Sequence, residues 1–337
     1  DLEKSGPSIV GQIEVGYQND CLKDVRNLLS PEKLAKIPNW ENLTPEQLKQ
    51  ALEQLPTDEQ LQRSYIQQEL SDYRSSAMAQ EEVYQILEQY DLPKTVNTIL
   101  AVQNMMYNQN GIFRKLFAQA ENTEDVSLAD LKEQVLEEFA EAVKTPEDMA
   151  KAQKVLAEKA ENVMKTMINE SEVTSVDLKE MRMIHTQIEL GTKMAKEETY
   201  HIPVLVGDSV TGVSLKIVRG KEEKGRVDIL FGGENIGKVA AQISVKGEKI
   251  EGYIVSDSKE TLEAFEKKEE MFAAMLGSDG QKVELRYVQA KNVELSENHT
   301  SRESSIKTEE RSETQTKTLY HMAESFLEVV QTLQISK

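Results

Sequence analysis

Hydrophobic residues before position 198 recur at three- and four-residue intervals, the spacing of one face of an α-helix. Leu128, Leu131, Val135 and Phe139 form one such stripe, with Glu, Lys and Gln filling the positions between them. The same spacing along this part of the chain predicts a series of helices. They span residues 19–36, 44–54, 57–89, 95–107, 111–120, 127–143, 146–168 and 174–197.

Local start signals support these helices. Thr44-Pro45-Glu46-Gln47 combines an N-cap residue, a proline at the first helical position and a glutamine three residues after the cap. Similar signals begin at Thr57, Ser127 and Thr145. We therefore expect a helical domain over residues 19–198. Residues 1–18 alternate between apolar and small polar residues, and we expect a lead segment there, as a short strand or without order.

Between Tyr200 and Tyr287 the period changes from helical spacing to alternation, which is typical of half-buried strands. Short glycine-containing turns separate the runs and predict antiparallel pairing. Pro203 marks its run as an edge strand or a strand start, because proline cannot donate to a sheet ladder. The expected strands span residues 202–206, 210–219, 226–231, 239–245, 250–255 and 283–288.

One helical stripe interrupts these strands. Ser258 is placed to cap a helix that carries Leu262, Phe265, Phe272, Met275 and Leu276 on one side. A sheet with one apolar face needs such a cover. The predicted fold class is therefore α+β: a helical N-terminal region, then a small, mostly antiparallel sheet with one covering helix over residues 199–290, then a C-terminal helix.

The tail divides into two parts. Residues 291–316 are rich in Ser, Thr, Glu and Lys, a composition typical of a flexible linker. Residues 317–337 are expected to form an amphipathic helix. Two roles remain open for it: docking onto the chain's own domains, or binding a partner's groove. The candidate partner-binding residues on its stripe are Leu319, Met322, Phe326 and Val330.

Charge and hydropathy narrow the possible partners. The formal net charge of −19 repels nucleic acids and anionic lipids, so neither is expected to bind. No apolar run approaches the roughly 20 residues that a membrane-spanning helix needs, so membrane insertion is not expected. Cys21 is the only cysteine, which excludes an intrachain disulfide. That fits a reducing compartment or an exported protein that does not rely on disulfides.

The sequence contains few candidates for catalytic, cofactor-binding or metal-binding residues. The four histidines, at positions 185, 201, 299 and 321, lack the spacing of metal-binding motifs, so no metal, cofactor or catalytic residue is expected. Gly232-Gly233 with Gly237 superficially suggests a phosphate loop. A predicted strand follows it, and the Lys-Ser/Thr pair of a phosphate loop is absent, so a hairpin turn explains these glycines better.

One segment of the predicted sheet resembles the C-terminal domain of flagellar hook-length control proteins. The resemblance lies in Asn235-Ile236-Gly237-Lys238-Val239, in Lys246-Gly247-Glu248-Lys249-Ile250 leading to Gly252-Tyr253-Ile254-Val255, and in the helix start at 258–262. The lead-in strands at 202–204 and 215–218 are also similar. The residues of this motif with expected structural roles are Ile236, Gly237, Val239, Gly247 and Gly252.

This resemblance implies a non-enzymatic function through protein–protein contacts. Proteins of this family are exported from the bacterial cytoplasm through the flagellar type III apparatus. Their C-terminal domain acts on the export-switch protein and changes the exported class from hook to filament subunits. Their N-terminal part contacts hook or hook-cap proteins. That part is usually extended and low in complexity, whereas residues 19–197 here are predicted to be helical, so the resemblance assigns this half no role.

Two other classes of function remain open. In the first, the chain is a helical structural or adaptor protein of another bacterial system, and its helices and tail bind the partner. In the second, it is an enzyme whose site has no recognisable motif, which a deep pocket with converging polar groups would reveal.

Overall fold

The structure is a computed structural model. It describes residues 81–107, 111–122, 130–169, 175–207, 209–233, 236–277, 281–291, 293 and 312–333. The predicted lead segment, the predicted helices at 19–36 and 44–54, and the predicted 57–89 helix before residue 81 lie outside the described residues, as does most of the predicted linker. Within the described residues, 81–107 and 167–187 belong to one compact unit, and 111–166 and 188–333 belong to a second.

The first unit contains helices α5 (Glu81–Gln89) and α6 (Val96–Tyr107), with the adjoining ends of α9 (Pro146–Asn169) and α10 (Ser175–Ala195). The break between the helices predicted at 57–89 and 95–107 is present, and the amide of Leu92 closes α5 on the carbonyl of Leu87 at 2.8 Å. Gln187 in α10 donates to the carbonyl of Ala101 in α6 at 3.0 Å, which fixes the two helices side by side.

The helices predicted at 111–120, 146–168 and 174–197 are confirmed as α7 (Gly111–Asn122), α9 and α10. The helix predicted at 127–143 is α8 (Leu131–Ala142). Its predicted cap at Ser127 lies outside the described residues.

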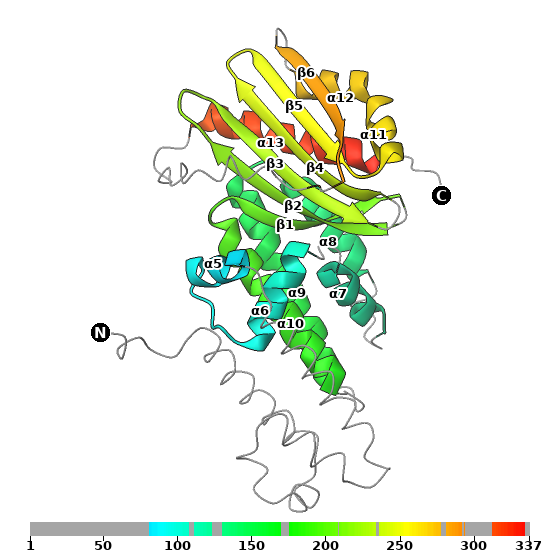
Figure 1. The fold of residues 1–337 in the computed structure, drawn as a ribbon. Helices are drawn as coiled ribbons and strands as arrows, with labels where there is room; N and C mark the ends of the chain where they lie inside the picture. The colour runs from blue at the N-terminus through cyan, green and yellow to red at the C-terminus, as the bar shows by residue number, and fades with distance from the viewer. Residues whose placement is uncertain are drawn as a thin grey trace, which may run out of the picture. The chain divides into compact units, whose positions relative to one another are not determined.

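The second unit is built on a six-stranded sheet, in the order β1-β2-β3-β4-β5-β6 within the described residues (Figure 1). The first five strands pair antiparallel with their neighbours, as the short turns predicted. The last strand pairs parallel with β5, because two helices carry the chain back across the sheet before it. The strands are β1 (Thr199–Val206), β2 (Ser209–Arg219), β3 (Gly225–Gly233), β4 (Gly237–Lys246), β5 (Lys249–Ser256) and β6 (Lys282–Gln289).

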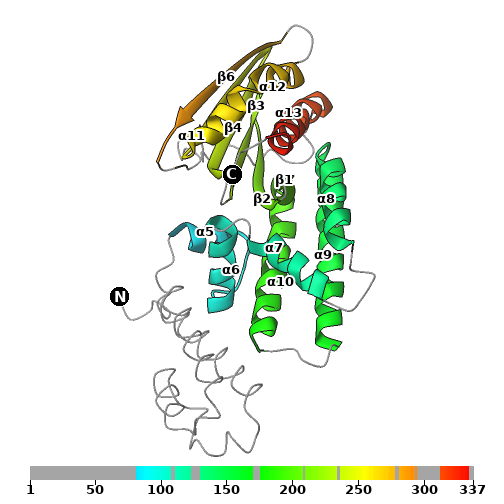
Figure 2. The same cartoon turned by 90° about the vertical axis from the view of Figure 1, so that its right-hand side faces the viewer.

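One face of this sheet is covered by α11 (Lys259–Glu266), α12 (Glu269–Leu276) and α13 (Glu313–Gln331) (Figure 2). The alternating residues expected on that face are buried there. Phe326 of α13 is central: its ring lies 6.1 Å from that of Phe231, 5.7 Å from that of Phe265 and 5.8 Å from that of Phe272. The buried strand residues on this face include Val213, Leu215, Ile217, Val227, Ile229, Val239, Ala241, Ile243 and Val245.

The covering helix predicted from Ser258 is present and is divided into two consecutive helices, α11 and α12. Lys267 ends α11, and Lys268 precedes α12 with φ −104° and ψ 5°, outside the helical region. The Lys268 amide bonds the Phe265 carbonyl at 2.9 Å, a tighter turn than that of an α-helix. The turn redirects the chain while Phe265 and Phe272 both contact Phe326.

The C-terminal helix begins at Glu313, four residues before its predicted start and inside the predicted linker. Ser312 caps it, since the Ser312 hydroxyl accepts the amide of Gln315 at 3.3 Å. Of the two roles left open for this helix, the structure shows docking onto its own chain. Leu319, Met322, Phe326 and Val330 are each 0 % exposed.

Candidate functional site

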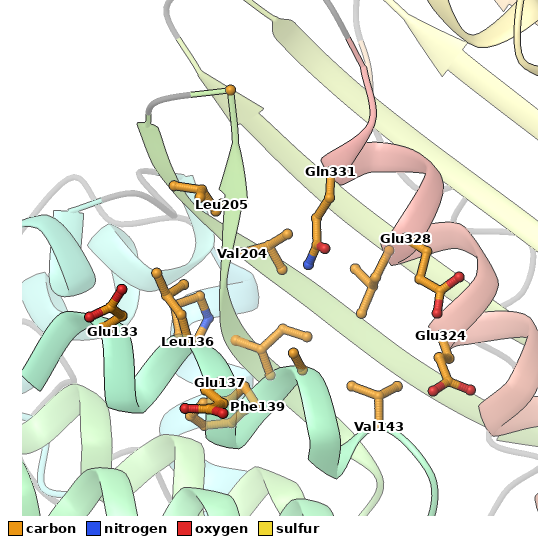
Figure 3. Close-up of a pocket in the computed structure, with 15 residues that line it drawn as sticks. Glu133, Leu136, Glu137, Phe139, Val143, Val204, Leu205, Glu324, Glu328 and Gln331 are labelled. Atoms are coloured by element: carbon orange, nitrogen blue, oxygen red, sulfur yellow. The ribbon is translucent and has the colours of Figure 1, made fainter.

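A groove of about 750 Å³ lies between α8 and α13, alongside β1 (Figure 3). All of its lining belongs to the second compact unit. We call it the edge groove, because β1 is the first strand of the sheet and, among the described residues, pairs with β2 alone. The lining residues are Glu133, Leu136, Glu137, Phe139, Ala140, Val143, Ile202, Pro203, Val204, Leu205, Gly207, Glu324, Leu327, Glu328 and Gln331.

The floor of the edge groove is β1, and the edge position predicted from Pro203 is confirmed. Antiparallel strands turn the backbone of alternate residues toward their neighbour. The amide of Ile217 bonds the carbonyl of Glu198 at 2.9 Å, so even-numbered positions of β1 face β2 and odd-numbered positions face outward. Gln153 donates to the carbonyl of His201 at 3.3 Å, which confirms that the backbone groups of this odd-numbered residue face outward.

Backbone groups of β1 are therefore directed toward the groove. Leu205 directs both its N–H and its C=O to the free edge. Pro203 directs only a C=O there, because proline has no backbone N–H. The Leu205 side chain is 39 % exposed, one of the few large apolar side chains at the surface among the described residues. The free edge of a sheet is a template for an added strand, and here it offers three groups.

One wall of the groove is α8. Leu131, Val135 and Phe139 anchor this helix, and each is no more than 2 % exposed. The helical period then turns the neighbouring positions, including Leu136, toward the groove. Glu133 and Glu137 lie one turn apart on the same side (Figure 3).

The other wall is α13, which presents Glu324, Leu327, Glu328 and Gln331. Glu324 and Glu328 are again one turn apart, and their carboxylates lie across the groove from those of α8 (Figure 3). Like charges at this helical spacing each cost about 0.2–0.5 kcal/mol. Both walls of the groove therefore carry such a pair.

The electrostatic character of the groove follows from its composition. Among the described residues that line it there are four glutamates and no lysine or arginine. The imidazole of His321 lies 4.0 Å from Glu324 but outside the lining, and its other nitrogen bonds the Met275 carbonyl at 2.7 Å. Within the described residues, no three His, Cys, Asp or Glu side chains are placed to hold a metal ion. The groove is thus an acidic surface over an apolar floor.

A buried polar cluster holds the α13 wall in place. Arg219, at the end of β2, donates to both carboxylate oxygens of Glu198, at 2.6 and 2.7 Å. Tyr320 of α13 donates to Glu198 at 3.1 Å and its hydroxyl lies 2.6 Å from that of Tyr200. Burial raises the pKa of the Tyr320 phenol, so it stays a neutral donor.

The same arginine reaches the first turn of α13. It donates to Gln315 at 3.3 Å and to Thr316 at 2.9 Å. Burial alone would lower the pKa of Arg219, but the bonds and charge of Glu198 outweigh burial and raise that pKa. We call Glu198, Tyr200, Arg219, Gln315 and Tyr320 the helix lock.

The motif residues predicted from the family resemblance lie in the strands and turns of the β3–β4–β5 meander, and none of them lines the groove. Gly237 and Gly247 have positive φ values of 68° and 62°, and each begins or ends a turn of the β3–β4–β5 meander. Gly252 packs under Leu285 of β6, where a Cβ would come within 2.6 Å of that side chain. Ile236 and Val239 are buried, at 5 % and 0 % exposure.

The candidate partner-binding residues of the C-terminal stripe are also outside the groove. Leu319, Met322, Phe326 and Val330 face the sheet, whereas the groove uses the next side of the same helix. Sequence reasoning missed the groove glutamates. Their signal is a pair of glutamates four residues apart on each of two helices, which is unremarkable in so acidic a chain.

Comparison with protein families, with curated proteins and with solved structures finds no match for this chain. No helix within the described parts of the chain has the length and apolar character needed to cross a membrane.

Proposed function

We propose that this chain acts by binding other proteins and has no catalytic activity of its own. The observation that carries the proposal is the edge groove, which combines an open strand edge with two acidic walls over apolar residues. Such surfaces bind peptide segments by adding a strand and by matching charge. Polar groups in the lining are spread along the two rims, as expected for a contact surface (Figure 3).

We propose further that the binding serves flagellar hook-length control, by switching the type III export apparatus from hook to filament subunits. Support comes from the segment that resembles this family. Its glycines meet geometric needs: Gly237 has a positive φ, and a side chain on it would collide with Asp257. The partners would then be the export-switch protein and hook or hook-cap subunits, met in the bacterial cytoplasm or during export.

Removing the gene in the source bacterium tests this role. A cell that lacks the switch keeps exporting hook subunits, so we expect longer hooks and fewer filaments. Hook length is measured by electron microscopy of isolated hook–basal bodies, and filament subunits are measured in the culture medium. The wild-type gene supplied in trans should restore both, whereas a gene without codons 200–290 should not. Unchanged hooks and filaments in the deletion strain would contradict the flagellar proposal.

A second candidate is an adaptor role in another bacterial system. The observation in its favour is that α8 and α13, the two walls of the groove, lie outside the segment that resembles the flagellar family. A photo-reactive amino acid in place of the exposed Leu205 can separate the two candidates in living cells. Crosslinks to the export-switch, hook or hook-cap proteins favour the flagellar role. Crosslinks confined to another assembly, with unchanged flagella, favour the adaptor role.

A further inference from the structure

We infer that the edge groove binds a short, extended segment of a partner protein in which basic and apolar residues alternate. The inference rests on the proposed protein-binding function and does not depend on the flagellar assignment. It follows from three properties of the groove: the direction of its backbone groups, the placement of its charges and the apolar residues between them.

The backbone groups require an extended guest. A helix satisfies its own amides and carbonyls, so it would cover the N–H and C=O of Leu205 and the C=O of Pro203 without bonding them. An extended segment can offer two N–H donors and one C=O acceptor to these three groups. The pairing is short, because Pro203 has no N–H and the carbonyl of His201 is already bonded to Gln153.

The charges require a cationic guest. Glu133 and Glu137 lie on one wall, and Glu324 and Glu328 lie on the other (Figure 3). A lysine or arginine between the walls would relieve the repulsion within each pair, which persists while the groove is empty of positive charge. A second copy of this chain is disfavoured as the guest by its net charge of −19, and a nucleic acid is disfavoured by its phosphates.

The apolar residues select the remaining positions of the guest. Besides its glutamates, the α8 wall contributes Leu136, Ala140 and Val143 to the lining, and the α13 wall contributes Leu327. Alternate side chains of an extended strand point to opposite sides. In a strand added to β1, one set faces α8 and the other faces α13. A segment of alternating basic and apolar residues therefore places its apolar set against the three apolar residues of the α8 wall and its basic set beside Glu324 and Glu328 of α13.

The probe is a fluorescein-labelled nine-residue peptide of alternating lysine and valine, added to the full chain and followed by fluorescence anisotropy. We expect saturable binding at 0.1 M salt, where the Debye length is about 10 Å, and weaker binding at 1 M salt, where it is about 3 Å. A peptide of alternating glutamate and valine, and one of alternating lysine and serine, should each bind at least about tenfold more weakly. Equal binding of all three peptides would overturn the inference.

Substitutions that replace glutamate by neutral glutamine show where on the surface the peptide binds. The groove variant carries E133Q, E137Q, E324Q and E328Q. Each exposed charge pair is worth about a twofold change in affinity, so four should weaken the lysine–valine peptide on the order of tenfold. The matched control carries E141Q, E158Q, E248Q and E270Q at four exposed positions that do not line the groove, and its affinity should stay within about twofold of wild type. An equal loss in both variants would overturn the assignment to the groove.

A backbone test decides whether the guest adds a strand. Leu205→Pro removes the outward N–H without touching the β1–β2 ladder, whereas Leu205→Ala removes the side chain and keeps that N–H. We expect Leu205→Pro to weaken binding at least about fivefold more than Leu205→Ala. Hydrogen exchange of the inward Val204 and Val206 amides verifies that β1 stays paired in both variants. Equal affinities in two variants with intact β1 pairing would overturn strand addition.

The peptide test and the cellular test fail separately. Absence of peptide binding, together with overlong hooks in the deletion strain, contradicts the inference and leaves the flagellar proposal in place. Groove-dependent peptide binding together with unchanged flagella supports the inference and contradicts the flagellar proposal.

Discussion

Gly237 shows how strongly one position can constrain the meander. Its φ of 68° is costly for any residue with a side chain, and a Cβ there would collide with the Asp257 carboxylate. That carboxylate also accepts the Lys238 amide at 2.7 Å, and so ties the end of β5 to the start of β4. A substitution would therefore strain the backbone and displace a hydrogen-bonded partner together.

We expect Gly237→Ala to lower the free energy of unfolding by about 2–5 kcal/mol. The left-handed conformation contributes about 1–2 kcal/mol of this loss, and the forced displacement of Asp257 contributes about 1–3 kcal/mol. Gly247→Ala is the matched control, because Gly247 has a φ of 62° and nothing within 4 Å of its missing Cβ. The control should lose only about 1–2 kcal/mol. Urea denaturation of both variants measures the difference, and equal losses would contradict the role of Asp257.

At the scale of elements, α13 is held on the sheet by two kinds of interaction. Phe326 supplies the centre of an aromatic cluster, and the helix lock supplies a charged pair in which Arg219 and Glu198 are 3 % and 6 % exposed. Leu319, Met322 and Val330 of α13 add further buried apolar side chains beside this cluster. The lock fixes the position of the helix along the sheet, because each of its bonds needs a particular side chain opposite.

Breaking the lock on one side should be more harmful than removing both charges. Arg219→Met leaves the Glu198 carboxylate buried without its cation, and we expect a loss of about 3–5 kcal/mol in unfolding free energy. The double variant Arg219→Met with Glu198→Met should recover most of that loss, because no unpaired charge remains. Chemical denaturation of the two variants forms the measurement. A double variant as unstable as the single one would show that the charged pair does not act as a unit.

Alternation and helical spacing predicted most elements because they report which side chains are buried. The strands on the covered face follow this rule from Val213 to Val245. Arg219 continues the same alternation, which indicates a buried position. Because arginine is charged, however, the pattern was not interpreted as burial. The break at Lys268 depends on where Phe265 and Phe272 meet Phe326, which is a tertiary contact. The groove joins residues about 190 positions apart in the sequence, from Glu133 to Glu324, and no local pattern could bring them together.

At the scale of the whole molecule, the helices over residues 111–166 pack with the sheet in one compact unit. The predicted boundary between residues 198 and 199 does not coincide with this division. His201 of β1 stacks on Phe113 of α7 at 5.2 Å, and α8 also contacts β1. These helices cover the face of β1 and β2 opposite to α13. The sheet is therefore enclosed from both sides at its first two strands.

A fragment of residues 196–333, which keeps Glu198 of the helix lock, should consequently be less stable than a fragment of residues 111–333. The shorter fragment exposes the surface that Phe113 and Phe139 bury, and each large aromatic side chain is worth about 1.5–3 kcal/mol. A loss of about 3 kcal/mol lowers the melting temperature of a domain of this size by roughly 6–12 °C. Calorimetry of both fragments checks this. Equal melting temperatures would mean that the helices contribute little to the sheet.

The late position of Phe326 in the sequence has a consequence for the order of events during synthesis. Translation releases β1 to β6 first and adds Phe326 at the centre of their apolar face only 37 residues after the end of β6 at Gln289. At usual rates of elongation this delay lasts roughly 2–7 s. During that interval the nascent sheet has no helix over part of its apolar face. The same chain therefore passes through a state open to chaperones, which closes when its last helix arrives.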